Sequence, residues 1–162
     1  MKALNNDNPL DRELQSRIED YFEYKWNFDR NLACSTEEDR SIMEQLPEFV
    51  QDRIYTKFLY RSFLLKFQLF FRIPVEDSGA SEHKGMFYTL DNNNYREFLM
   101  LLLNSMSPLR FDRGDTIFDH ETEVNEVDFI EQGNVDIGFA VSRGTKYALR
   151  LFDSSVLGAY HC

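Results

Sequence analysis

Apolar side chains recur every fourth position in the first strongly patterned stretch of the chain, while most positions between them are charged or polar. The apolar positions are Leu14, Ile18, Phe22 and Trp26, with Tyr21 beside them. This spacing places them on one stripe of an α-helix. The pattern predicts a helix over residues 11–28, whose aromatic residues have packing against the next helix as their simplest role.

The following stretch carries the signals of a short capped helix. Ser35 and Glu38 have the spacing of a capping box, in which each side chain satisfies a free backbone N–H. A polar linker, residues 27–33, is expected before this helix, and Pro47 is expected to end it. The predicted inner face consists of Ile42, Met43 and Leu46.

Two more helices are predicted between Pro47 and Pro74. Pro47 suits a first helical turn, because its missing N–H donor costs nothing there. A break near residues 61–62 is expected before a helix over residues 63–73, which falls far short of the roughly 20 residues that span a bilayer. The apolar face before the break comprises Phe49, Val50, Ile54, Phe58 and Leu59.

Residues 74–94 are rich in Gly, Ser, Asn and acidic side chains. They predict an exposed inserted loop, which is tolerable because the entropy cost of closing a loop grows slowly with its length. Asn94 is expected to cap a helix over residues 95–105, and Pro108 follows its end. The side chains expected to pack on the strands that follow are Phe98, Leu99, Leu102 and Leu103.

In the last third of the chain, apolar side chains recur at every second position instead of every fourth. Alternation of apolar and polar side chains predicts strands with one buried face. Gly114, which precedes Asp115, and Gly133 lie at the joints, and each is expected to take the positive φ of a tight turn between antiparallel strands. The alternating apolar positions are Val127, Phe129, Val135, Ile137 and Phe139.

Composition narrows the classes of function. The 162 residues carry a formal charge of -10, which disfavours a nucleic-acid partner. Cys34 and Cys162 are far apart and lack metal-binding spacing, which fits a reducing, intracellular setting. The three histidines are scattered and no nucleophile motif appears, so we expect neither an enzyme nor a metal site, and residues 119–121 are expected to form a solvated turn.

Three motifs in the last third resemble the first half of a cyclic-nucleotide-binding domain. That β-roll opens with an aromatic-x-x-Gly-Asp turn, matched by Phe111 to Asp115, and continues with a Phe-Ile-x-x-Gly hairpin, matched by Phe129 to Gly133. The family's phosphate-binding cassette begins Phe-Gly-Glu, and the corresponding residues are Leu157, Gly158 and Ala159. Only the combination of the three motifs is specific.

The helical part resembles the C-linker, which joins the last pore helix to the nucleotide-binding domain in cyclic-nucleotide-gated, hyperpolarisation-activated and voltage-gated potassium-type cation channels. The order of the two halves matches these channels better than nucleotide-regulated kinases or transcription factors, which lack a C-linker. The matching residues are Tyr21-Phe22-Glu23, Trp26, Glu37 to Asp39, Leu46-Pro47 and Arg53-Ile54.

The resemblance implies an α+β fold with four parts. A disordered lead, residues 1–10, precedes a helical C-linker-like region at 11–73, the inserted loop at 74–94, and a partial antiparallel β-roll, or partial jelly roll, at 95–162. It also implies a cytoplasmic gating module of a tetrameric cation channel, joined to a transmembrane pore domain. Identical or related channel subunits would be its partners, with intramolecular packing as the alternative role of the residues that would touch them: Tyr21, Phe22, Trp26 and Arg53.

Ala159 departs from the family pattern at a ligand-binding position. The family's Glu accepts a hydrogen bond from the ribose 2′-hydroxyl, which an alanine cannot do. We therefore expect binding of cyclic AMP or cyclic GMP to be weak or lost, and no cofactor is certain. The family's phosphate-binding Arg and the rest of its barrel would follow Cys162, so we expect the sequence to be a fragment, truncated before the end of its β-roll.

A second hypothesis keeps the β-roll as the cyclic-nucleotide sensor of a soluble regulatory protein, of the kinase regulatory subunit type. Sequence upstream of Met1 would distinguish the two. Six hydrophobic helices with a pore loop would support a channel, and a dimerisation helix would support a soluble regulator.

Overall fold

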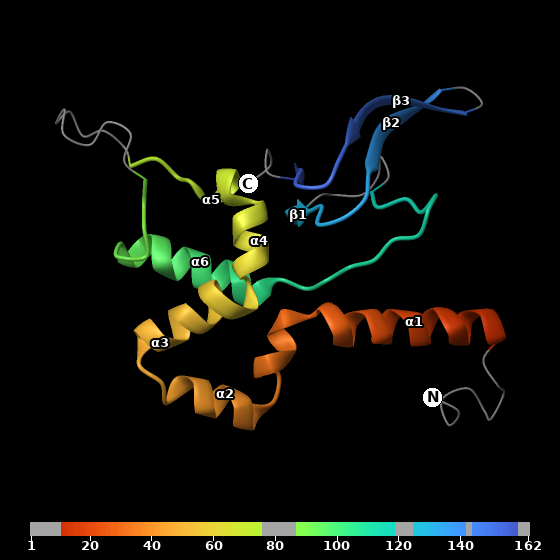
Figure 1. The fold of residues 1–162 in the computed structure, drawn as a ribbon. Helices are drawn as coiled ribbons and strands as arrows, with labels where there is room; N and C mark the ends of the chain where they lie inside the picture. Colours follow the sequence, from red (N-terminus) through yellow and green to blue (C-terminus); the bar gives the residue numbers. More distant parts are fainter. Residues whose placement is uncertain (1–10, 76–86, 119–124, 142–143, 159–162) are drawn as a thin grey trace. The chain divides into compact units, whose positions relative to one another are not determined.

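The computed structural model describes residues 11–75, 87–118, 125–141 and 144–158 (Figure 1). It combines helices with small antiparallel sheets, so the α+β expectation is confirmed at that level. The chain divides into two compact units by its internal packing. One contains Met1–Leu59 and Glu97–Arg113, and the other contains Tyr60–Arg96 and Gly114–Cys162.

Helix α1 runs from Arg12 to Phe28, so the first predicted helix is confirmed. None of its residues is buried, however. The predicted packing of its aromatic stripe against the next helix is not found, because Trp26 is 69% exposed and Phe22 is 39% exposed. Their rings instead lie against each other, with centroids 5.8 Å apart. An apolar stripe shows which side of a helix is suited to burial, but not what buries it.

The structure differs from the prediction in the linker after α1 and in the residue that caps α2. A 3₁₀-helix, η2 (Arg30–Cys34), replaces part of the polar linker. Helix α2 (Glu37–Glu44) is capped by Thr36, whose hydroxyl oxygen accepts a hydrogen bond from the Asp39 N–H at 3.1 Å. Ser35 cannot fill this position because its backbone is helical, whereas Thr36 has the extended conformation of an N-cap. Ile42, predicted to face inward, is 60% exposed.

Pro47 is the N-cap of α3 (Glu48–Arg53) rather than its first helical residue. A π-helix, η3 (Ile54–Leu59), follows directly. Its wider turns change which side chains face inward, so Phe58, placed on the apolar face by 3.6-residue spacing, is 77% exposed, while Tyr55 is buried. Phe49, also predicted to face inward, is 64% exposed in the first turn of α3.

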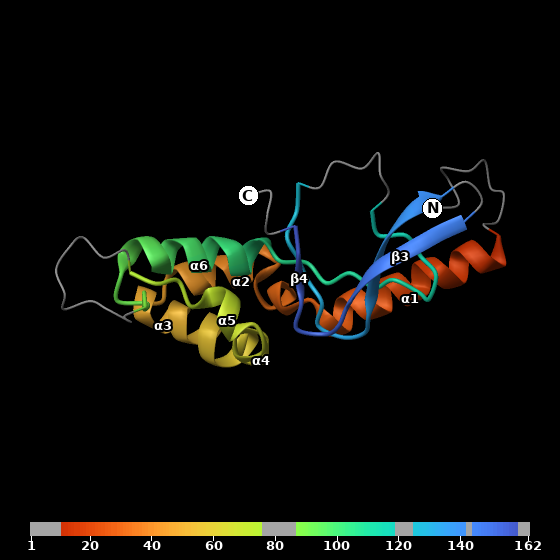
Figure 2. The ribbon, with the colours of Figure 1, turned by 90° about the horizontal axis from the view of Figure 1, so that it is seen from above.

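The region predicted as one helix over residues 63–73 forms two short helices, α4 (Arg61–Lys66) and α5 (Gln68–Phe71). Figures 1 and 2 show them as separate elements. Phe67 interrupts the helix, because its ψ of 24° lies outside the helical range. The predicted break near residues 61–62 falls one residue earlier, at Tyr60.

Helix α6 (Asn93–Ser105) is confirmed, but the side chain of Asn92, not Asn94, accepts the capping hydrogen bond from the Tyr95 N–H. Of its four predicted packing residues, Leu99 and Leu103 are buried, whereas Phe98 is 41% exposed. The carbonyls at its end are bound by the side-chain amide of Asn31, which donates to the backbone oxygens of Leu103, Asn104 and Met106.

The described strands form two separate antiparallel pairs. Strand β1 (Asp128–Phe129) pairs with β4 (Val156–Leu157), and β2 (Val135–Val141) pairs with β3 (Gly144–Leu151), both antiparallel. Gly114 and Gly133 have the predicted positive φ, at 98° and 100°. Gly133 nevertheless connects β1 to β2, which are not partners, so its predicted role between paired strands is wrong.

The predicted buried face of the longer strand pair is exposed. Ile137 is 41% exposed and Phe139 is 53% exposed. Alternation identifies the apolar face of a strand, but burial needs a second layer of side chains over that face. No such layer covers it within the described part of the chain.

Candidate functional site

The predicted cassette residues lie at the end of the short β1–β4 pair. Leu157 belongs to β4, where it is the partner of Asp128, and Gly158 follows with φ of 79°. A Cβ atom at residue 158 would collide with the backbone carbonyl of Glu126. This glycine is therefore required by its own chain, without reference to a phosphate. Ala159 lies outside the described residues.

Backbone hydrogen bonds continue from the strand pair into the segments beside it. The N–H of Ile130 donates to the Ser155 carbonyl at 3.0 Å, and the N–H of Ser154 donates to the Ile130 carbonyl at 2.8 Å. Ile130 is 8% exposed. These bonds hold residues 130 and 154–155 in register with β1 and β4, so the segment preceding the cassette position is fixed at several points.

An aromatic cluster fastens β1 to the helices of the same unit. The ring of Phe129 lies 5.0 to 6.0 Å, between centroids, from four other phenylalanine rings. Three of these contacts are edge-to-face, a geometry that aromatic quadrupoles favour. The partners lie on α4, on α5 and between them: Phe63, Phe67, Phe70 and Phe71.

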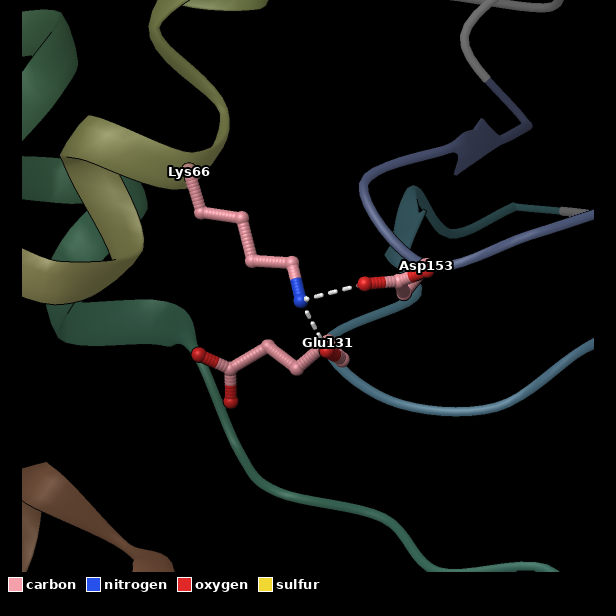
Figure 3. Close-up of polar contacts among 3 residues, drawn as sticks. All are labelled: Lys66, Glu131 and Asp153. Atoms are coloured by element: carbon pink, nitrogen blue, oxygen red, sulfur yellow. Dashed lines mark hydrogen bonds and ion pairs between the residues drawn. The ribbon is translucent and has the colours of Figure 1, made fainter.

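Lys66 makes a second connection between α4 and the same strand pair (Figure 3). Its ammonium group donates to the backbone carbonyl of Glu131 and lies 3.2 Å from the Asp153 carboxylate. The side chain of Lys66 is 28% exposed and that of Asp153 is 60% exposed. Glu131 follows β1 and Asp153 precedes β4. The Lys66 ammonium group therefore links α4 to both sides of the β1–β4 pair.

Two carboxyl groups in the unit have perturbed acidities with distinct causes. Burial raises the pKa of Asp128, and the nearby negative charge of Glu126 raises it further. The pKa of Asp136, on the exposed β2–β3 pair, is lowered mainly by its hydrogen bonds from Arg150. Of these two carboxyl groups, only Asp128 lies on the β1–β4 pair that leads to Gly158.

The chain matches no protein-family model, no curated protein and no solved structure. Within the described ranges, no three His, Cys, Asp or Glu side chains are grouped so as to hold a metal ion. Nor is any helix in those ranges both long enough and apolar enough to cross a membrane.

The remaining predicted site residues are surface groups. Tyr21, Phe22 and Trp26 lie exposed on α1, and Arg53 is exposed at the end of α3. Gly114 and Asp115 form the predicted turn, which is exposed, but no strand flanks it within the described residues 106–118. The predicted acidic and histidine-containing turn at residues 119–121 lies outside the described residues.

Sequence reasoning missed the connection through Lys66, Phe129 and Asp153. A signal for part of it was present, since Lys66 interrupts the most apolar run of the chain. A lone cation in such a run commonly keeps its charged end at a polar partner while its stem lies along apolar surface. The partner itself is 87 positions away and has no local signature.

Proposed function

We propose that the chain is the cytoplasmic gating module of a tetrameric cation channel. In this role it couples a degenerate cyclic-nucleotide-binding-like domain to the transmembrane pore. The observation that carries the proposal is the double connection of the strand pair that leads to Gly158. The Phe129 cluster and the Lys66 contacts both attach it to α4 and α5. A strand pair attached in this way can pass a displacement of its own on to α4 and α5.

The exposed aromatic residues of α1 support assembly with other subunits. Three large rings, those of Tyr21, Phe22 and Trp26, are 39 to 69% exposed on one helix. Aromatic residues are enriched in the cores of protein interfaces, and an exposed cluster of them marks a contact surface. Their order also matches the C-linker motif on which the channel hypothesis is based.

Two features support a weak or lost nucleotide site. Gly158 is explained by contact with the Glu126 backbone, so no phosphate is needed to account for a glycine there. The next residue, Ala159, offers no acceptor for a ribose hydroxyl. The module would then respond to assembly or to other segments rather than to cyclic nucleotide.

Calorimetric titration of cyclic AMP and cyclic GMP into the domain extended beyond Cys162, where the family's phosphate-binding Arg would lie, tests whether the nucleotide site is degenerate. We expect no saturable heat at nucleotide concentrations up to about 1 mM, where a site binding at −4 kcal/mol would be half filled. Saturable binding near 1 μM, about −8 kcal/mol, would contradict the degenerate site, and the sequence upstream of Met1 would then distinguish a nucleotide-gated channel from a soluble sensor. Far-UV circular dichroism of the same sample confirms that the titrated protein is folded.

A further inference from the structure

The α4–α5 segment has an outer face that neither the strand contacts nor the channel proposal uses. Its inner stripe is defined by Phe63, Phe67 and Phe71, which are 2 to 6% exposed and lie against one another. Two positions along a helix rotate a side chain by about 200°. Leu65 and Leu69, each two positions after an inner residue, therefore point away from the aromatic cluster.

These leucines are unusually exposed for aliphatic side chains. Leu65 is 60% exposed and Leu69 is 82% exposed, and Ile73, two positions after Phe71, is 37% exposed. Arg61 lies one helical turn before Leu65 on α4, and Arg72 directly follows the end of α5; both are exposed. The guanidinium of Arg72 lies over the Phe87 ring, 4.3 Å from its centroid. The outer face thus consists of Arg61, Leu65, Leu69, Arg72 and Ile73.

The charge of this segment opposes that of the chain. Residues 60–75 contain three Lys or Arg and no Asp or Glu. Since the whole chain carries -10 and this segment +3, the other residues carry -13. Screening at physiological salt limits exposed charges to a range of about 8 Å, so a surface that approaches the outer face meets mainly its arginines.

We propose that the outer face of α4–α5 binds an anionic lipid surface, with its aliphatic side chains entering the headgroup layer and its arginines binding lipid phosphates. Aliphatic side chains flanked by basic ones are the composition of interfacial anchors. The outer face offers only a few side chains, which suffice for lipid contact. A stable protein interface needs about 20 to 30 residues from each partner. The inference is independent of the channel proposal.

Flotation of the full chain with lipid vesicles tests it. Vesicles of phosphatidylcholine with 40% phosphatidylserine should bind the chain at least about tenfold more tightly than vesicles of phosphatidylcholine alone. Arg61→Gln with Arg72→Gln should weaken binding about 25-fold, since each basic residue near an anionic surface contributes about fivefold. Leu65→Gln with Leu69→Gln should weaken it at least about tenfold.

Matched controls carry equal changes elsewhere on the surface. Arg17→Gln with Arg113→Gln removes the same charge, and Leu149→Gln with Phe139→Gln removes comparably exposed apolar groups. Equal losses in test and control variants, or no vesicle binding, would overturn the proposal. Loss of self-association in the leucine variant, with vesicle binding unchanged, would assign the face to a second copy of the chain and overturn it as well.

Discussion

Lys66 reaches Asp153 across 87 positions of the sequence, with 3.2 Å between the ammonium nitrogen and a carboxylate oxygen. The same ammonium group donates to the Glu131 carbonyl. The two contacts differ in expected strength. Asp153 is 60% exposed, and exposed ion pairs contribute roughly 0 to 1 kcal/mol, whereas a hydrogen bond from a charged group contributes about 1.5 to 3 kcal/mol.

We therefore expect Lys66→Met to lower the free energy of unfolding by about 1 to 2 kcal/mol, and Asp153→Asn by about 0.5 kcal/mol or less. Urea denaturation followed by circular dichroism measures both. Lys66→Arg, which keeps a charged donor, is the control and should retain most of the stability. Equal losses from Lys66→Met and Asp153→Asn would show that the exposed ion pair, not the carbonyl bond, supplies the connection.

Phe129 should be among the most sensitive positions of its unit. Its ring contacts four other phenylalanines, so Phe129→Ala would leave a void among them and cost about 3 kcal/mol. Phe139→Ala is the matched control, because its ring is 53% exposed and its loss should cost less than about 1 kcal/mol. Similar losses at the two positions, measured by urea denaturation, would argue against an energetic role for the cluster.

The two glycines with positive φ should respond differently to alanine. At Gly133 nothing lies within 4 Å of an added Cβ, so Gly133→Ala has only the backbone penalty of about 1 to 2 kcal/mol. Gly158→Ala adds a collision with the Glu126 carbonyl and should cost about 2 to 4 kcal/mol. Thermal unfolding of both variants provides the comparison. A milder effect at residue 158 would mean that the backbone there can move aside.

Asp128 should make stability depend on pH in the acidic range. Its pKa in the folded protein is raised above 3.8, so the folded state binds more protons than the unfolded chain in this window. Its contribution is fully present below the unfolded pKa and is lost as pH rises through the folded pKa. Asp128→Asn should remove this loss, so the variant gains stability relative to the parent as pH rises above 3.8.

Urea denaturation at several pH values measures that difference. Glu126→Gln is the companion variant, since it removes the second cause of the raised pKa and should reduce the pH dependence without abolishing it. A parent protein and an Asp128→Asn variant with parallel pH profiles would contradict the assignment.

The sequence predicted the helices better than the contacts between them. The four-residue spacing in α1 and the proline at residue 47 gave sound positions for elements, because spacing and local backbone chemistry act within a few residues. Thr36 was missed as a cap because Ser35 has the same chemistry, and only the backbone conformation distinguishes them. Phe58 was misplaced because a π-turn has no clear signature in residue type.

The candidate site was predicted only in part. The positive φ of Gly114 and Gly133 follows from local turn chemistry, whereas Gly158 was singled out by the cassette resemblance and its positive φ was not predicted. The pairing of β1 with β4 brings together residues 128–129 and 156–157, which no alternation pattern specifies. The Phe129 cluster was hidden for the same reason, since any apolar strand residue can contact any apolar helix and tertiary packing makes the choice.

Sedimentation velocity tests the central claim, that the chain works as a subunit of a tetramer, most directly. At about 100 μM, where weak association is favoured by mass action, we predict a species of four 19.3-kDa chains. Trp26→Ala with Phe22→Ala should shift it toward monomer, while Phe139→Ala with Leu149→Ala should not. A monomer at this concentration, or a tetramer unaffected by loss of the α1 aromatics, would contradict the account.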